Sequence, residues 1–489
     1  MVPPIHRVVA ALVALQLAPV LAKEYLPVKA CTALQAPKVE GAVVKRLTAT
    51  EKTSAGVVVC DVNVYLTHGT AADTVRIQTY LPLHNYTGRF QGLGGGGMVA
   101  GVFDEALALT AGQGYAVGST DAGRANATMT DATWAGNEQL LINFAYLSVH
   151  EMTVVGKALA AQFYGVPVEY SYWNGCSNGG RQGYEEAQRY PGDYDGVLAN
   201  APGINWDRFL VADLHPFLVE VKNNVYPPKC VWETITAEAV KACDMLDGGR
   251  DGVINLPHLC RYNGRAAIGK DACGTPITDI HADMWNEITR GPLDPAGNPV
   301  WAGRLPGTNL NETAGAQPFV VSMTWTASFV EFNSSFDVST IPFDKLYAEV
   351  AKSEVLYRPI MGGDNPDLSG FRDAGGKLLT WHGLVDQILY PFGTTNYRLR
   401  VEKRLGGNAA VNDFYRLFMA PGVQHCGGGI GAQPIDPLSL LVDWVEKDKA
   451  PKVMPASGDI GTRNLCLFPK NLIYSGKGDL ANASSWICL

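Results

Sequence analysis

A short glycine-rich turn, Gly175-Cys176-Ser177-Asn178-Gly179, constrains the fold of this chain more than any other segment. It has the pattern Gly-x-Ser-x-Gly, whose small residues let a strand turn sharply into a helix and leave the serine hydroxyl exposed at a sheet edge. A chain with 53 glycines also produces such a pentapeptide by chance, and a plain turn with a buried serine is the alternative. The flanking residues decide between these interpretations.

Both flanks favour the sharp strand-to-helix turn. Residues 166–173 are rich in β-branched and aromatic types, which favours a strand, and Pro167 stands near its start. Residues 180–190 predict a helix that ends before Pro191, and residues 154–164 predict an earlier one. Strand, turn and helix therefore follow in the order of the nucleophile elbow, on which α/β-hydrolases carry their serine.

The wider chain alternates strand-like and helix-like stretches, which predicts a mostly parallel sheet covered by helices. Strand-like stretches before residue 205 are 75–80, 115–119 and 196–199, and the alternation resumes at 377–381 and 415–419. Between them the sequence turns irregular and rich in proline, tryptophan and cysteine. We therefore predict an α/β-hydrolase fold with a catalytic domain at 23–205 and 356–489, interrupted by a lid domain at 206–355.

The first 22 residues have the pattern of a secretory signal peptide. His6 and Arg7 precede the apolar residues 8–17, and Val20-Leu21-Ala22 offers a cleavage site. Ten cysteines in an exported chain suggest five disulfides. Five Asn-x-Ser/Thr sequons would permit glycosylation, at Asn85, Asn126, Asn311, Asn333 and Asn482. These features predict a secreted glycoprotein.

The charge of the chain argues against some classes of partner. A formal net charge of −8 disfavours binding to nucleic acid or to an anionic membrane surface. The apolar stretch near the start is too short to span a bilayer, and no later one approaches twenty residues. We expect no nucleic-acid and no membrane partner.

The order of residues after Ser177 selects two catalytic partners. In α/β-hydrolases an acidic residue and then a histidine follow the serine, each on a loop after a sheet strand. Asp386 follows the strand-like 377–381, and His425 follows 415–419. His425 would accept the serine proton while Asp386 orients the imidazole. His382 is expected to be a packing or hydrogen-bonding neighbour, and a loop cap is the alternative role for Asp386.

Cysteines adjoin both ends of this predicted triad. Cys176 precedes the serine and Cys426 follows the histidine. If the triad assembles, these cysteines lie close together and an oxidising compartment would join them. In the chain-entropy view, a disulfide closing a loop this long stabilises the fold by on the order of 5 kcal/mol.

The arrangement Cys176-Ser177, Asp386 and His425-Cys426 resembles the tannase and feruloyl esterase family of secreted α/β-hydrolases. The resemblance covers nearly all of the chain after the signal, and its further segments are Gly88-Arg89-Phe90, Tyr194-Asp195-Gly196, Ala201-Pro202-Gly203, Trp381-His382-Gly383 and Pro421 to Cys426. It implies a serine esterase for aromatic acids, foremost a feruloyl esterase that acts on plant cell-wall esters. A tannase acting on gallate esters of polyphenols is the close alternative, and a hydrolase-like binding protein without catalysis is the other class.

The glycine run that ends at Gly97 has two interpretations. Residues 92–97 match Gly-x-Gly-x-x-Gly, but a dinucleotide site needs a βαβ unit and an acidic residue about twenty positions on. Asp121 comes rather late, so we predict no organic cofactor. An α/β-hydrolase instead needs backbone donors for the oxyanion. The resemblance implies the amides of Gly97 and Asn178, and the choice among the four consecutive glycines stays open.

Residues 243–254 concentrate three aspartates around glycines that make a helix improbable. Oxygen ligands in a tight loop suit Ca²⁺. The resemblance implies a structural calcium in the lid, and its ligands would be Asp244, Asp247, Asp251 and the carbonyls of Gly249 and Val253. A solvated acidic turn is the alternative.

The other cysteines divide into four expected pairs. Cys243 and Cys260 flank the acidic loop and are expected to bond to each other. The resemblance implies Cys31–Cys60 and Cys466–Cys488, which leaves Cys230–Cys273 by elimination. Four lid aromatics are candidates for contacting the acyl ring, although core packing is the commoner role for each: Trp206, Trp325, Phe329 and Phe332.

Overall fold

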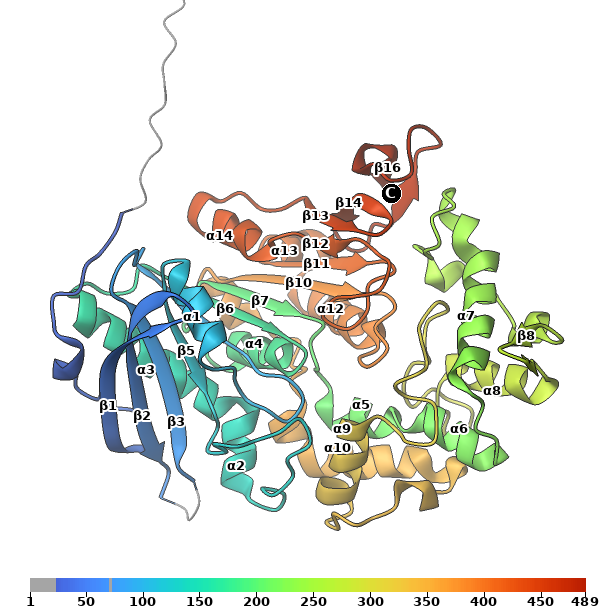
Figure 1. Ribbon diagram of the computed structural model, residues 1–489, viewed down its shortest axis with the longest axis horizontal. Helices are drawn as coiled ribbons and strands as arrows, with labels where there is room; N and C mark the ends of the chain where they lie inside the picture. The colour runs from blue at the N-terminus through green and yellow to red at the C-terminus, as the bar shows by residue number, and fades with distance from the viewer. Residues whose placement is uncertain (1–22, 70–72) are drawn as a thin grey trace, which may run out of the picture.

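A nine-stranded mixed sheet forms the centre of the computed structural model, which describes residues 23–69 and 73–489 (Figure 1). The predicted signal peptide, residues 1–22, lies outside this range. In spatial order the strands are β1 (Val43–Ser54), β2 (Val57–Thr67), β3 (Val75–Pro82), β5 (Tyr115–Thr120), β4 (Arg89–Leu93), β6 (Tyr170–Cys176), β7 (Gly196–Asn200), β10 (Lys377–Gly383) and β11 (Tyr415–Ala420).

The six strands β5, β4, β6, β7, β10 and β11 run parallel to one another. At the other end of the sheet, β1, β2, β3 and β5 pair antiparallel with their neighbours. The carboxyl ends of β6, β7, β10 and β11 therefore meet at one edge of the sheet. This edge is where an open α/β sheet carries its functional loops. The architecture confirms the predicted α/β-hydrolase fold.

Alternating side chains of the parallel strands enter two hydrophobic layers. In β6 the side chain of Trp173 packs on one face with that of Leu378, and Tyr172 packs on the other with Leu379. On the first face lie α3 (Ser148–Tyr164), α4 (Asn178–Arg189) and α12 (Pro391–Leu405). On the second lie α1 (Glu105–Gly112) and α14 (Pro437–Lys447). Both faces are covered, as a parallel sheet requires.

The elements around Ser177 begin at different residues from those predicted. The strand β6 begins at Tyr170 rather than at residue 166, because its neighbour β4 begins at Arg89, the partner of Tyr170. The helix α4 begins at Asn178, directly after the serine, and α3 begins at Ser148 rather than at residue 154. The predicted strand, turn and helix are confirmed in kind and order.

Between β7 and β10 the chain adds no strand to the central sheet. The α-helices of residues 206–361 lie below and to the right of the sheet in Figure 1, and they are α5 (Trp206–Ala212), α6 (His215–Asn223), α7 (Lys229–Cys243), α8 (Asp279–Arg290), α9 (Val320–Trp325) and α10 (Leu346–Met361). The ribbon β8 (Asp271–Ala272) and β9 (Thr275–Pro276) also lies here. We call residues 206–361 the insertion. The predicted lid boundaries stay a prediction, and α10 runs through the one at residue 355.

Small elements complete the catalytic side of the chain. Two further helices are α11 (Ser369–Asp373) and α13 (Asn408–Asn412), and a short helix α2 (Glu138–Ile142) precedes α3. Beyond β11 lie a three-stranded sheet of β12 (Gln433–Pro434), β13 (Val453–Gly458) and β14 (Gly461–Cys466), and a ribbon of β15 (Leu472–Tyr474) and β16 (Trp486–Cys488). Within the part of the chain that is described, no helix combines the length and apolar character needed to cross a bilayer.

The ten cysteines form five disulfides in the expected pairs. Four of them link Cys31 to Cys60, Cys230 to Cys273, Cys243 to Cys260, and Cys466 to Cys488. The fifth joins Cys176 to Cys426. The first of these bonds links the N-terminal segment to β2, two lie within the insertion, and one lies among the C-terminal strands. The fifth joins the end of β6 to the loop after β11.

Candidate active site

Ser177 occupies a strained turn between β6 and α4. Its φ of 64° and ψ of −123° lie in a region that side chains rarely adopt and that is often found at functional sites. Close packing explains the neighbouring glycines: a Cβ on Gly175 would lie 2.5 Å from the backbone of Gly179, and one on Gly180 would lie 2.4 Å from the Asn200 carbonyl. Ser177 is half-buried, and its hydroxyl makes no hydrogen bond within residues 23–69 and 73–489. The turn therefore presents a free hydroxyl at the sheet edge.

The glycine loop after β4 packs against this turn. The N–H of Gly179 donates to the Gly95 carbonyl at 2.8 Å, and a Cβ on Gly94 would lie 2.5 Å from the Gly179 Cα. The side-chain amide of Asn178 donates to the Val99 carbonyl at 3.0 Å. The next helix, α1, begins only at Glu105, so no helix opens on the glycines as a dinucleotide site requires.

Two backbone donors remain available where the glycine loop meets the turn. Gly97 has a φ of 53°, which favours glycine, and its N–H donates to no acceptor in the described chain. The N–H of Asn178 likewise has none there, because the first residue of a helix lacks an intrahelical acceptor. The structure thus leaves free the two amides that the sequence resemblance implied.

Asp386 is buried beneath two imidazoles. Its Oδ2 lies 2.8 Å from His425 Nδ1 and 3.0 Å from His382 Nε2, and its Oδ1 accepts the N–H groups of Ile388 and Leu389 at 2.9 and 2.7 Å. Burial alone would raise the pKa of Asp386, but the two imidazoles outweigh it and hold that pKa well below its usual range. Asp386 is therefore an ionised carboxylate that orients His425.

His382 is the hydrogen-bonding neighbour that the sequence predicted. Its Nδ1 lies 2.8 Å from the Thr394 hydroxyl on α12, and its Nε2 faces both Asp386 and the Leu389 carbonyl at 3.2 Å. The ring is fully buried. It therefore connects the carboxylate to α12 and cannot itself reach a substrate.

The Cys176–Cys426 disulfide brings the serine and histidine loops together. The two Cα atoms lie 6.0 Å apart although 250 positions separate them in the chain. His425 Nε2 lies 3.6 Å from Cys426 Sγ, so the free nitrogen of the ring is turned toward the bond that also holds the residue before Ser177. The side chain of His425 is 13% exposed, so the ring keeps some contact with solvent.

Sequence reasoning missed Gln387, which joins the histidine loop to the insertion. Its side-chain oxygen accepts the N–H of His425 at 3.1 Å, and its amide donates to Glu312 at 3.0 Å. In the sequence, only its place directly after Asp386 could have indicated a role for Gln387. Its partner Glu312 lies 75 positions away, in a segment without regular periodicity.

The acidic loop folds around its own aspartates. Asp244 Oδ1 accepts the N–H groups of Asp251 and Gly252 at 3.2 and 3.1 Å, and Asp251 pairs with Arg463 at 2.6 Å. Asp247 is 1% exposed, and its Oδ2 has no hydrogen-bond partner in the described chain. Burial, with the charges of Asp251 and Asp244, raises the pKa of Asp247 to about 7. An uncompensated buried carboxylate fits a cation, although the three carboxylates do not converge within 4.8 Å of one another.

This loop also contacts the segment that carries His425. A Cβ on Gly422 would lie 2.8 Å from a methyl group of Val253, and one on Gly249 would lie 2.7 Å from the Trp486 ring. The acidic loop is thus packed between the histidine loop and the C-terminal ribbon. Its conformation therefore bears directly on the position of His425.

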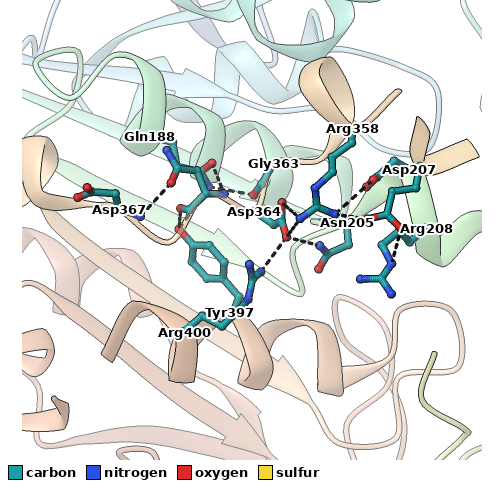
Figure 2. A network of polar contacts seen from close by, with 12 residues as sticks. Gln188, Asn205, Asp207, Arg208, Arg358, Gly363, Asp364, Asp367, Tyr397 and Arg400 are labelled. Carbon is teal, nitrogen blue, oxygen red and sulfur yellow. Dashed lines mark hydrogen bonds and ion pairs between the residues drawn. The ribbon is translucent and has the colours of Figure 1, made fainter. Parts of the chain in front are cut away.

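A charged network fastens the insertion to the catalytic side (Figure 2). Asp364 accepts Asn205 at 2.7 Å, Arg400 of α12 at 2.8 Å and Arg358 of α10 at 3.2 Å. Arg358 also lies 3.8 Å from Asp207, a fully buried residue of α5 whose oxygens have no hydrogen-bond partner in the described residues. Burial and the neighbouring Asp364 raise the pKa of Asp207 to about 7.

Three of the four candidate lid aromatics are core residues. Trp206, Trp325 and Phe329 are at most 3% exposed, and Trp325 stacks on Phe329 with ring centroids 4.5 Å apart. Phe332 is 61% exposed. Their mutual packing provides the apolar centre of the insertion, so the commoner of the two expected roles holds for the first three.

Comparisons with known proteins agree with this geometry. A family model described as tannase and feruloyl esterase matches residues 60–279 and 285–489. A probable feruloyl esterase from Arthroderma benhamiae is 40% identical over 500 residues, which cover 94% of this chain and 93% of that protein. Feruloyl esterase B from Aspergillus niger is 34% identical over 84% of this chain and 83% of its own length.

A solved structure extends the likeness to three dimensions. The crystal structure of feruloyl esterase B from Aspergillus oryzae superposes with a TM-score of 0.83 at 26% identity, over 93% of this chain and 98% of that one. Sequence and fold therefore agree over nearly the whole length, and the chain belongs to the tannase and feruloyl esterase family.

Proposed function

We propose that this protein is a serine esterase that hydrolyses carboxylic esters of aromatic acids, with feruloyl esters of the plant cell wall as the foremost substrates. The observation that carries the proposal is the Asp386–His425 pair held by one disulfide beside the strained Ser177. Membership of the family and the names of its relatives support the aromatic-ester class. A gallate ester is the alternative substrate within the same chemistry.

The proposed reaction proceeds in two halves. Ser177 Oγ attacks the ester carbonyl carbon while His425 Nε2 accepts the hydroxyl proton, and Asp386 stabilises the imidazolium through Nδ1. The tetrahedral intermediate collapses, His425 returns the proton to the leaving alcohol, and the aromatic acyl group stays on Ser177. A water molecule then attacks the acyl carbonyl carbon and gives a proton to His425 Nε2. As the bond to Ser177 Oγ breaks, His425 returns this proton to the serine and the free acid leaves.

The amides of Gly97 and Asn178 are the proposed oxyanion donors. Both N–H groups lack another acceptor in the described residues, and they lie where the glycine loop meets the turn that carries Ser177. Donors that are fixed before the reaction stabilise the developing oxyanion without reorganisation, and each contributes about 10²–10³ in rate.

Calcium is the ion proposed for the acidic loop. The ion would be bound by the carboxylates of Asp244, Asp247 and Asp251 and by the carbonyls of Gly249 and Val253. Its positive charge would compensate the buried carboxylate of Asp247, which has no other partner in the described chain. Its part is structural. The loop packs against the segment of His425, so the ion would stabilise the position of the base without touching the substrate.

We also propose that the protein is exported and glycosylated. Five disulfides and the fungal relatives support an extracellular enzyme. Four of the five sequon asparagines, Asn85, Asn126, Asn333 and Asn482, are exposed, as glycan addition requires. Mass spectrometry of the secreted protein before and after glycosidase treatment would identify the occupied sites.

Replacement of the serine tests the proposed activity. Ser177→Ala is expected to lower kcat for methyl ferulate by at least about 10³-fold, since the nucleophile is gone while the binding site is retained. The exposed Ser475→Ala is the matched control and should leave the rate unchanged. Comparable rates for Ser177→Ala and wild type would contradict the proposal, and a wild type without any esterase activity would favour a binding protein.

A panel of esters separates the two substrate classes. Methyl ferulate, caffeate and p-coumarate represent the hydroxycinnamates, and methyl gallate represents the tannase alternative. We expect higher kcat/KM values for the hydroxycinnamates. A kcat/KM that is highest for methyl gallate would assign the chain to the tannase side of the family.

A further inference from the structure

Three ligand-capable side chains converge on the helical face of the sheet, apart from the proposed active site. His150 lies in the first turn of α3, Glu186 in the last turn of α4, and Asp193 in the connection from α4 to β7. One donor atom of each lies within 4.8 Å of the other two, and no other three His, Cys, Asp or Glu side chains in the described residues do so. At 1.5 Å per residue, Glu186 lies about 13 Å along α4 from Ser177.

Glu186 lacks the partners that a buried carboxyl group requires. It is 1% exposed, and neither of its oxygens has a hydrogen-bond partner in the described chain. Burying an ionised carboxylate without compensation is costly, so such a group binds a cation or stays neutral. Its place in the group therefore points to a ligand.

The other two side chains are already oriented. His150 Nδ1 lies 2.6 Å from Asp193 Oδ2, and the imidazole stacks on the Tyr190 ring with centroids 3.8 Å apart. The side chain of His150 is 29% exposed and that of Asp193 is 16% exposed. The group is thus buried at Glu186 and open to solvent on the side of His150, which gives an ion a path of entry.

The charged groups around the site leave an excess of negative charge. Lys157 donates to the backbone carbonyl of Asp193 and is the nearby ammonium. Against it stand the carboxylates of Glu186 and Asp193, and that of Asp195, which accepts the N–H and hydroxyl of Ser171 at 2.7 and 2.8 Å. A divalent cation would balance this excess.

We propose that His150, Glu186 and Asp193 bind one divalent transition-metal ion, and that Zn²⁺ is the ion their donor set fits. One imidazole nitrogen with two carboxylates suits zinc, whereas calcium and magnesium take oxygen ligands. Three protein ligands leave one position for water on the exposed side. The ion joins α3 to the end of α4, the helix whose first residue follows Ser177.

A shared proton is the competing occupant of the site. Burial and the neighbouring Asp193 raise the pKa of Glu186 well above its ordinary value, so a neutral carboxyl is the state expected without a cation. The two occupants differ in their response to zinc. Only with a metal site does the protein bind one Zn²⁺ per chain and become more stable as the concentration of free Zn²⁺ rises.

Zinc titration of the full chain tests the proposal. The protein is freed of metals, saturated with Ca²⁺ so that the acidic loop is supplied, and titrated with Zn²⁺ by calorimetry and thermal unfolding. We expect one ion per chain and a Tm that rises with free Zn²⁺. Glu186→Gln and Asp193→Asn should each weaken binding by at least about tenfold, because a neutral amide is a poor zinc ligand.

A control and a third ligand variant make the outcome decisive. His84→Gln removes an exposed histidine outside the group and should leave the affinity for Zn²⁺ unchanged. His150→Gln changes the more exposed ligand, so it should weaken binding even if a variant at a buried position fails to fold. Hydrolysis rates should stay the same with and without zinc, since the ion lies apart from Ser177. No zinc uptake, or uptake unaffected by all three substitutions in the group, would overturn the proposal in favour of the shared proton.

Discussion

Asp386 is the residue on which the proposed chemistry most depends. It accepts two backbone N–H groups on one oxygen and faces two imidazoles on the other, so its orientation is fixed from every side. The sequence predicted its role through the order of strands and histidines. It also predicted His382 as a neighbour, but the contact of His382 with Thr394 depends on where α12 packs, which no local pattern encodes.

Asp386→Asn should lower kcat by about 10³–10⁴ with little change in KM, because the amide favours the wrong imidazole tautomer without altering the substrate site. Steady-state kinetics on methyl ferulate would measure the effect. The exposed Asp373→Asn is the control and should match wild type. A large rise in KM at unchanged kcat would show that Asp386 serves binding instead.

At the scale of elements, the loops after β6 and β11 are joined by one covalent bond. Cys176 and Cys426 were predicted as a pair because both adjoin triad residues, and the structure confirms the bond. The start of β6 was predicted four residues too early, because Val166 and Val168 favour a strand although residues 166–169 have no partner strand beside them. Pairing in the sheet, and not propensity, decides where that strand begins.

Removing this disulfide should affect both stability and rate. Cys176→Ala with Cys426→Ala is expected to lower the free energy of unfolding by up to about 5 kcal/mol and to lower kcat, because two catalytic loops lose their link. Cys31→Ala with Cys60→Ala removes a bond that closes a loop of 29 positions away from the active site, and it should cost about 3–4 kcal/mol and leave kcat unchanged. Equal losses of kcat in the two double variants would contradict the link.

The contact of α5 with α10 should depend on pH through Asp207. Burial raises the pKa of Asp207 from 3.8 to about 7 in the folded protein, so the folded state favours the protonated carboxyl. The free energy of unfolding is therefore highest below about pH 4 and decreases as the pH rises through 7. Asp207→Asn mimics the protonated form. It should therefore be more stable than wild type at pH 8, by roughly 2–4 kcal/mol, and similar to it at pH 4.

Chemical denaturation at both pH values measures this difference. The matched control is Asp344→Asn, at an exposed residue of the insertion, which should leave the pH dependence of wild type unchanged. The same stability difference between Asp207→Asn and wild type at pH 4 and pH 8 would show that the carboxyl does not titrate in this range.

Across the whole molecule, the insertion contacts the catalytic loops at several points. Glu312 contacts Gln387, and Val253 packs on Gly422, so segments far apart in sequence together fix the loop of His425. The sequence predicted the triad from the order of strands and motifs, and the acidic loop from its local composition. Two of the disulfides were implied only by the family resemblance, and a third followed by elimination. The sequence could not predict Gln387 with Glu312, the network of Asp364, or the group around Glu186, since these form only when separate helices pack.

Calcium removal should weaken both the fold and the rate. A Ca²⁺-selective chelator is expected to lower Tm by several degrees and to reduce kcat, because the acidic loop packs against the segment of His425. Re-addition of Ca²⁺ should restore both, and Mg²⁺ should not. Asp247→Asn should be insensitive to the chelator. A Tm that the chelator leaves unchanged would count against the ion.

Trapping the acyl-enzyme would show whether the aromatic acyl group is carried by Ser177. The enzyme is mixed rapidly with 4-nitrophenyl ferulate, quenched in acid and digested, and its peptides are analysed by mass spectrometry. We expect a burst of about one equivalent of nitrophenol and a feruloyl group on the peptide that contains Ser177. Full turnover with the acyl group on another residue would contradict an acyl-enzyme on Ser177. Full turnover with no burst and no acyl group on Ser177 would contradict it as well.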